Sequence, residues 1–210
     1  NRHWGIIHSK EVFKNDIPFD HKKGILLWRG ATTGQINRPA NRFNLVTSYF
    51  SSTNPKINIG FSNIVWGTVD NSGNIIDYNE YKPYVKGKMT VQQQLQYKYL
   101  LSVDGNDKSS SLNWLLASNS VVFMAKPTKI SWLMEDKLIQ NVHYIQLKEE
   151  PSDLEEKIVW CESHPNECRE IVINSNKYMS QFYQDDREKY IEAQVIMRYI
   201  HKINFSKVYF

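Results

Sequence analysis

Residues 97–120 read YKYLLSVDGNDKSSSLNWLLASNS, and this stretch decides the fold class. The apolar run Tyr97–Val103 predicts a buried strand, and Asp104–Asp107 predicts a turn. Apolar residues recur at helical spacing over Ser109–Ala117, and Ser120–Met124 predicts the next strand. Strand, turn, helix and strand in this order are typical of an α/β fold, in which helices cover a parallel sheet.

The same alternation continues on both sides of this stretch. Short apolar or β-branched runs predict further strands, and polar runs with helical spacing predict short helices between them. The predicted strands are Ile25–Trp28, Ile57–Trp66 and Val142–Leu147, the predicted helices are Thr90–Gln96 and Ser131–Leu138, and Val69–Tyr84 is expected to be a loop or hairpin. The whole pattern predicts a Rossmann-like parallel sheet with flanking helices.

The C-terminal part of the chain is predicted to be helical. Ser152 and Glu155 have the spacing of a capping box, in which each side chain bonds a free backbone N–H at the helix start. Pro165 is expected to end that helix, and a long last helix is predicted over Arg187–Ile203. We therefore expect a Rossmann-like domain over residues 1–183 and a C-terminal helical segment over residues 184–210.

Composition narrows the range of partners. The 210 residues are 41% hydrophobic, which is enough for a substantial core, and the net charge is +4. Basic residues alternate with acidic ones, so the charge pattern does not favour nucleic acid. Apolar runs such as Val121–Ala125 are too short to cross a membrane, which takes about 20 residues. Cys161 and Cys168 alone do not form a zinc site; a disulfide and two buried thiols both remain open.

The loop after the strand at residues 97–103 is the first candidate binding site. Ligands of open α/β sheets bind at the carboxyl ends of the strands, and free N–H groups at a helix start bind phosphate. A tight turn with a serine N-cap and no ligand explains the pattern equally well. The candidate residues are Asp104, Gly105, Asn106, Lys108, Ser109, Ser110 and Ser111.

Trp28–Gly34 is the second candidate, again directly after a predicted strand. An arginine at a strand end can bind an anion through its fork of donors, and glycine allows close backbone approach. The alternative is a surface loop whose arginines pair with nearby acids. The candidate residues are Arg29, Gly30, Ala31, Thr33, Arg38 and Arg42.

Five segments, in order, resemble glycosyltransferase family 90, which includes protein O-glucosyltransferases and capsule-associated proteins. They are Trp28–Gly34, Arg42–Val46, Lys98–Phe123, His143–Tyr144 and Leu154–Trp160. The resemblance implies the C-terminal, donor-binding domain of a GT-B glycosyltransferase, with an N-terminal domain as partner. It further implies a UDP-sugar donor, a hydroxyl acceptor on a protein or glycan, inversion, and no metal or other cofactor. The Arg29–Thr33 loop, with Arg38 or Arg42, is then expected to face the diphosphate.

The chain departs from the family pattern at two positions. Ser111 stands where family members usually carry arginine, and Lys108 is a candidate to compensate for the lost charge-assisted contact. Trp132 stands where an acidic residue is usual, with Glu135 and Asp136 close by in sequence. No catalytic base is assigned, because the family's base lies in the N-terminal domain.

The sequence allows two roles for each of two further residues, Asp104 and His143. Asp104 is at a strand end, but we expect it to form a turn with its own backbone rather than act as a base. His143 either lines the cleft or is a structural histidine. The functional alternatives are an active transferase, a degenerate nucleotide-binding module of the same family, and an unrelated nucleotide-binding α/β domain.

Overall fold

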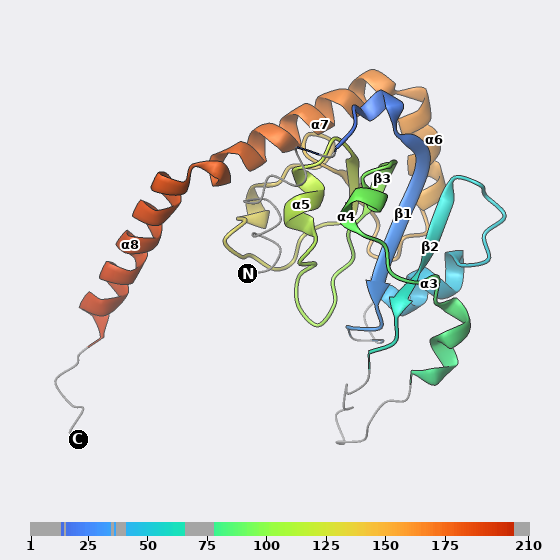
Figure 1. Cartoon of the computed structure of the whole chain (residues 1–210), viewed down its shortest axis with the longest axis horizontal. Coiled ribbons are helices and arrows are strands. Elements are labelled where there is room, and N and C mark those ends of the chain that lie inside the picture. The colour runs from blue at the N-terminus through green and yellow to red at the C-terminus, as the bar shows by residue number, and fades with distance from the viewer. Residues whose placement is uncertain (1–13, 15, 35, 37–40, 66–77, 204–210) are drawn as a thin grey trace.

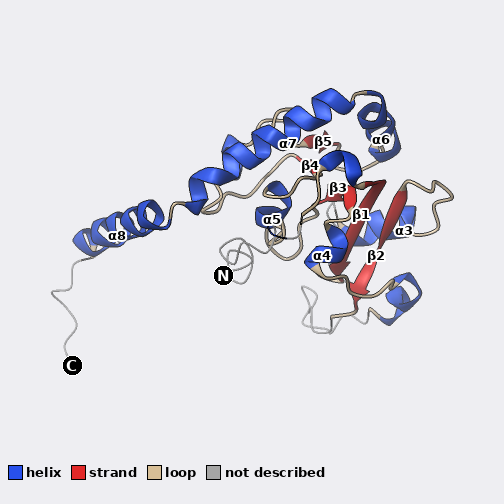
Figure 2. Ribbon diagram, turned by 45° about the horizontal axis from the view of Figure 1, so that its top comes forward, coloured by secondary structure: helices blue, strands red, loops and turns tan. Residues whose placement is uncertain are grey.

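The computed structural model describes residues 14, 16–34, 36, 41–65 and 78–203. In this part of the chain five strands form one parallel sheet, in the order β2-β1-β3-β4-β5 (β1 to β3 are labelled in Figure 1 and all five strands in Figure 2). The strands are β1 (Lys23–Ala31), β2 (Ile57–Asn63), β3 (Tyr97–Leu101), β4 (Val121–Ala125) and β5 (Ile145–Leu147). Each predicted strand is present, and the predicted parallel α/β sheet is confirmed.

Helices and 3-10 turns connect the strands and follow the last one. The helices are α3 (Arg42–Tyr49), α4 (Val91–Gln94), α5 (Leu112–Leu116), α6 (Leu154–Ser163), α7 (Pro165–Ser180) and α8 (Asp185–Lys202). The 3-10 turns are η1 (Phe19–His21), η2 (Asn79–Tyr84), η3 (Glu135–Lys137) and η4 (Gln181–Tyr183). Much of the predicted loop Val69–Tyr84 lies outside the described residues, and its last part forms η2.

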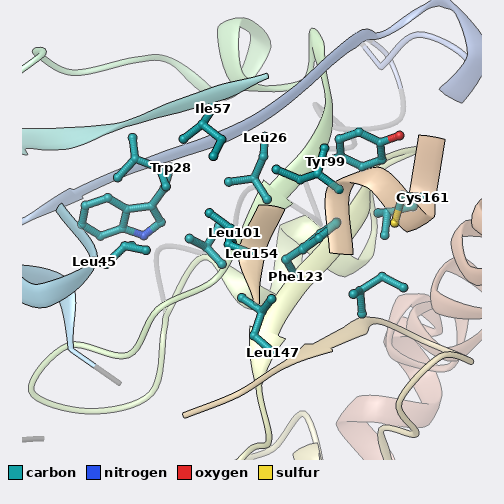
Figure 3. Close-up of a cluster of buried hydrophobic side chains, with 14 of the residues drawn as sticks. Leu26, Trp28, Leu45, Ile57, Tyr99, Leu101, Phe123, Leu147, Leu154 and Cys161 are labelled. Atoms are coloured by element: carbon teal, nitrogen blue, oxygen red, sulfur yellow. The ribbon is translucent and has the colours of Figure 1, made fainter. Parts of the chain in front are cut away.

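The sheet is covered on both faces, which explains why its strands are apolar runs rather than alternating patterns. One face packs against α3 and α6 around Trp28, Tyr99 and Phe123 (Figure 3). The other packs against α5, with Leu27 and Leu100 at the sheet surface. Helix α7 contributes to both cores, because its first half joins the α6 side and Met179 joins the α5 side.

The strand order reverses between β1 and β3. From β1 the chain moves to one side of the sheet to form β2, and then returns to the other side for β3, β4 and β5. Leu27 of β1 pairs with Leu100 of β3, so the two strands end next to each other. Such a switch point leaves a crevice at the carboxyl ends of the strands, where open α/β sheets bind ligands.

Three predictions of local structure outside the two candidate loops are wrong. Only η3 forms within the predicted helix Ser131–Leu138. The capping box at Ser152 is absent, because α6 is preceded by Asp153, whose carboxylate instead accepts from the Lys148 amide at 3.1 Å. Pro165 is the first residue of α7 rather than the end of α6, since proline needs no N–H partner at that position.

Helix α8 continues beyond α7 and η4 and extends away from the sheet (Figure 1, Figure 2). It exposes large apolar side chains, including Tyr190, Val195, Met197 and Tyr199. Among the described helices, none combines the length and the apolar character needed to cross a lipid bilayer.

Candidate functional site

A cavity of about 440 Å³ lies at the carboxyl ends of β3, β4 and β5. Its walls come from the loops that follow these strands, together with the start of α3 on one side and of α5 on the other. The lining includes Gly34, Asn41, Leu45, Leu101 to Gly105, Lys108, Leu112, Met124 to Lys129, Glu135, Leu147 to Glu149 and Pro151. The cavity therefore occupies the edge of the sheet where the fold predicts a ligand.

The two loops selected from the sequence meet at this edge. The Gly34 amide donates to Asn106 Oδ1 at 2.8 Å. Gly34 has φ of +105°, and a Cβ built on it lies 3.2 Å from the backbone of Gly105. A Cβ on Gly105 lies 2.8 Å from Thr33 Oγ1. Glycine is therefore needed at position 34 because the two backbones touch, and at position 105 because the side chains of Thr33 and Arg42 take the space of a Cβ.

Arg42 fastens these loops together. Its Nη1 donates to the Ala31 carbonyl at 3.1 Å and to Thr33 Oγ1 at 2.6 Å, at the carboxyl end of β1. Nη2 donates to the Val103 carbonyl at 3.0 Å, and Nε to the Asp104 carbonyl at 3.1 Å, which lie after β3. Burial lowers the pKa of Arg42 to about 10, so the side chain stays cationic at neutral pH. The guanidinium therefore lies between the carboxyl ends of β1 and β3, and Arg42 is not among the residues that line the cavity.

Arg29 is not brought to the Asp104 loop. Its Nη1 donates to the carbonyls of Trp28 and Asn58, and Nη2 donates to Asn58 Oδ1 at 2.8 Å. These bonds direct the guanidinium toward β2, and the residue does not line the cavity. Gly30 is the second-last residue of β1, and a Cβ there would lie 2.5 Å from the Trp28 ring. Arg38 lies outside the described residues.

Asp104 forms the turn that the sequence predicts. Its Oδ1 accepts from the Ser109 amide at 2.8 Å. The predicted helix start at Ser109 is wrong, because α5 begins at Leu112 and the Ser109 amide is already bonded. Ser109 Oγ and Ser111 Oγ are 3.0 Å apart, and Ser110 is exposed. The Ser109 amide is therefore taken by Asp104, and phosphate binding by the other N–H groups of this loop stays a prediction.

Lys108 forms a buried ion pair with Glu135 in the cavity wall. Lys108 Nζ lies 2.9 Å from Glu135 Oε1, and 2% of the Glu135 side chain is exposed. Burial alone would raise the pKa of Glu135, but hydrogen bonds from Lys108 and Ser131 outweigh it and lower the pKa. Of the two acids near the departure at Trp132, Glu135 is the one that reaches the cavity.

Three lysines of the cavity were missed by the sequence analysis: Lys126, Lys129 and Lys148. Lys129 Nζ is buried and has no hydrogen-bond partner among the described residues. Its nearest acids are Asp104 and Asp107, at 3.7 and 3.8 Å, which is too far for a hydrogen bond. The signal was available, since Lys126 and Lys129 directly follow a predicted strand, as Asp104 does.

His143 lies away from the cavity, just before the amino end of β5. Its Nδ1 accepts from the Ile139 amide at 2.9 Å, and its ring lies 5.2 Å from that of Tyr178. Burial lowers the pKa of His143, so the neutral ring that accepts this bond is favoured. These contacts agree with the structural role and not with a place in the cleft. Cys161 and Cys168 are buried free thiols.

Residues 4–206 match the family described as glycosyl transferase family 90. The chain belongs to glycosyltransferase family 90. It is 32% identical over 188 residues to O-glucosyltransferase LpsA of Dichelobacter nodosus, covering 90% of this chain and 53% of that protein. It is 31% identical over 128 residues to protein O-glucosyltransferase 2 of Danio rerio, covering 57% of this chain and 25% of that protein. The chain thus spans about half, or less, of the length of these relatives.

A comparison with a solved structure concerns the fold of this chain. Sucrose-phosphate synthase of Thermosynechococcus elongatus, a GT-B enzyme, aligns with a TM-score of 0.51 at 11% identity. The alignment covers 93% of this chain and 49% of that one. At this identity the likeness shows the fold alone, and it confirms a Rossmann-like domain of the GT-B type that ends in a helical segment.

Proposed function

We propose that this chain is the donor-binding half of a glycosyltransferase that uses a UDP-sugar and no metal. The acceptor is a hydroxyl group on a protein or glycan. Its oxygen forms a bond to the anomeric carbon while the bond from that carbon to the diphosphate oxygen breaks, which inverts the configuration. UDP leaves with the electron pair, and the acceptor proton passes to a carboxylate of a preceding domain. Membership of family 90 and the names of the relatives support sugar transfer.

The proposal rests on the ammonium group of Lys129, which is buried and has two carboxylates within 4 Å but no hydrogen bond. A buried charge without a hydrogen bond is costly, so such a group is expected to have a ligand in the functional state. A diphosphate supplies acceptor oxygens and two or more negative charges. Lys126 and Lys148 line the same cavity, so that with Lys108 and Lys129 four lysines face three acids, Asp104, Glu135 and Glu149. Fixed cations of this kind stabilise a departing diphosphate, which is the role a metal ion has in other transferases.

The chain's length relative to its relatives supports the proposal that another domain supplies the catalytic base and the acceptor site. Because it covers 53% of the bacterial O-glucosyltransferase, a second domain is the natural source of the catalytic base and acceptor site. The exposed apolar side chains of α8 are available to contact such a domain. The alternative is a nucleotide-binding module of the same family that transfers no sugar. Turnover of UDP-glucose by the complete protein distinguishes the transferase from such a module.

UDP binding to the chain tests the donor site. We expect UDP to bind by calorimetry and Lys129→Met to weaken it about tenfold to a hundredfold, since a charge-assisted hydrogen bond contributes roughly 1.5–3 kcal/mol. Lys137→Met is the control, because Lys137 is exposed and pairs with Asp136 outside the cavity. Arg29→Ala is expected to leave UDP affinity unchanged. If it weakens binding more than Lys129→Met does, the assignment of the diphosphate to Lys129 is wrong.

A further inference from the structure

The turn Ser131–Glu135 has an unusual backbone. Met134 adopts φ 54° and ψ 54°, in the left-handed region that costs free energy for any residue with a side chain. The turn is closed by the Met134 amide, which donates to the Ser131 carbonyl at 2.9 Å. Strain of this kind persists only where surrounding contacts hold it, and it concentrates at functional sites.

One result of the strained turn is the position of Glu135. Its carboxylate folds back over the turn and accepts from the Ser131 amide at 2.6 Å and from Ser131 Oγ at 2.8 Å. From there it pairs with Lys108, which also donates to Asn113 Oδ1 at 3.1 Å. The pair joins η3 to the loop after β3. Both charged residues line the cavity, so this contact sets the shape of one wall.

Tyr178, which does not line the cavity, contacts the turn from the side of the second core, the α5 side of the sheet. The hydroxyl of Tyr178, on α7, donates to the Leu133 carbonyl at 2.6 Å and lies 2.9 Å from the Met134 carbonyl. These carbonyls flank the strained residue, and burial raises the pKa of Tyr178 to about 12, so the phenol keeps its proton. The bond comes from the α5 side of the sheet, where Tyr178 packs against the second core.

We propose that Tyr178 is a positioning residue for the donor site, acting through the Met134 turn and the Glu135–Lys108 pair. Its hydroxyl keeps Met134 left-handed, the left-handed turn keeps Glu135 over Ser131, and Glu135 keeps Lys108 and the Asp104–Leu112 loop in place. Without the hydroxyl the turn relaxes, the ion pair loses its fixed geometry, and the cavity wall is no longer preformed. As far as the ligand is UDP, this inference rests on the function proposed above.

Tyr178→Phe tests this chain of contacts, because it removes the hydroxyl and keeps the ring. We expect UDP affinity to fall about fivefold, which corresponds to about 1 kcal/mol. In the Glu135→Gln background the same substitution should cause no further loss. Tyr99→Phe is the matched control, since Tyr99 is also buried and its hydroxyl bonds Glu162 at the far end of the sheet. It should weaken the fold and leave UDP affinity unchanged.

Hydrogen exchange gives a readout that needs no ligand. In Tyr178→Phe the amides of residues 104–112 should exchange several-fold faster, and in Tyr99→Phe they should not. Equal effects of the two substitutions, or none from Tyr178→Phe, would overturn the inference. If the unchanged chain fails to bind UDP, the proposed function is wrong, and exchange at residues 104–112 still decides whether Tyr178 positions the cavity wall.

Discussion

Replacing Arg42 by methionine removes the contact that joins β1 to β3 at the switch point. Methionine keeps much of the side-chain volume and loses every donor. Four acceptors lose a partner: the carbonyl oxygens of Ala31, Val103 and Asp104, and the hydroxyl of Thr33. The guanidinium also lies 5.7 Å from the centre of the Trp28 ring, and this contact is lost as well.

The loss of stability can be worked out from these four acceptors. A net contribution of about 1 kcal/mol for each hydrogen bond gives roughly 4 kcal/mol. The four residues that carry these acceptors are half-buried, so water reaches some of the freed groups and reduces the loss. We therefore expect the free energy of unfolding to fall by about 3 kcal/mol. With a urea dependence of about 3 kcal/mol per molar, the midpoint shifts down by about 1 M.

Urea unfolding followed by tryptophan fluorescence measures this shift. Arg169→Met is the control, because Arg169 forms an exposed pair with Asp20 and its loss should not move the midpoint measurably. An unchanged midpoint for Arg42→Met, together with loss of UDP binding, would refute the reasoning. That result would mean that Arg42 contacts the diphosphate, as the sequence suggests, and is not a fastening residue.

Two other predictions follow from the same site. Gly105→Ala should lower the midpoint in urea and weaken UDP binding, because the new Cβ lies 2.8 Å from Thr33 Oγ1 and 3.1 Å from Arg42 Nη2; unchanged values would show that the loops separate freely. Glu135 has a pKa below its usual value, so its ion pair stabilises the fold above about pH 4.3, the unfolded value, and this contribution is lost as the pH falls through the folded pKa. Urea midpoints of wild type and Glu135→Gln should therefore approach each other as the pH falls below about 4.3, and a difference that stays constant as the pH falls would contradict this.

The sequence alone predicts the parallel sheet and two of the loops at its functional edge. Strand runs and turn residues are local signals, so Tyr97–Val103 and Asp104–Asp107 could be recognised without the fold. The Asp104 turn is confirmed for the same reason, because its hydrogen bond joins residues close in sequence. The meeting of Gly34 with Asn106 is different, because it also requires β1 to lie beside β3, and no local pattern gives that strand order.

Only the tertiary structure decided which cations face the cavity. Arg29 bonds Asn58 because β2 lies beside β1. Arg42 donates its hydrogen bonds to carbonyls at the ends of two separate strands. Lys129 reaches the cavity because β4 ends next to β3. These outcomes depend on strand order and on contacts between residues far apart in sequence, which no local pattern encodes. The sequence therefore determined where along the chain a site would form, and packing determined which side chains form it.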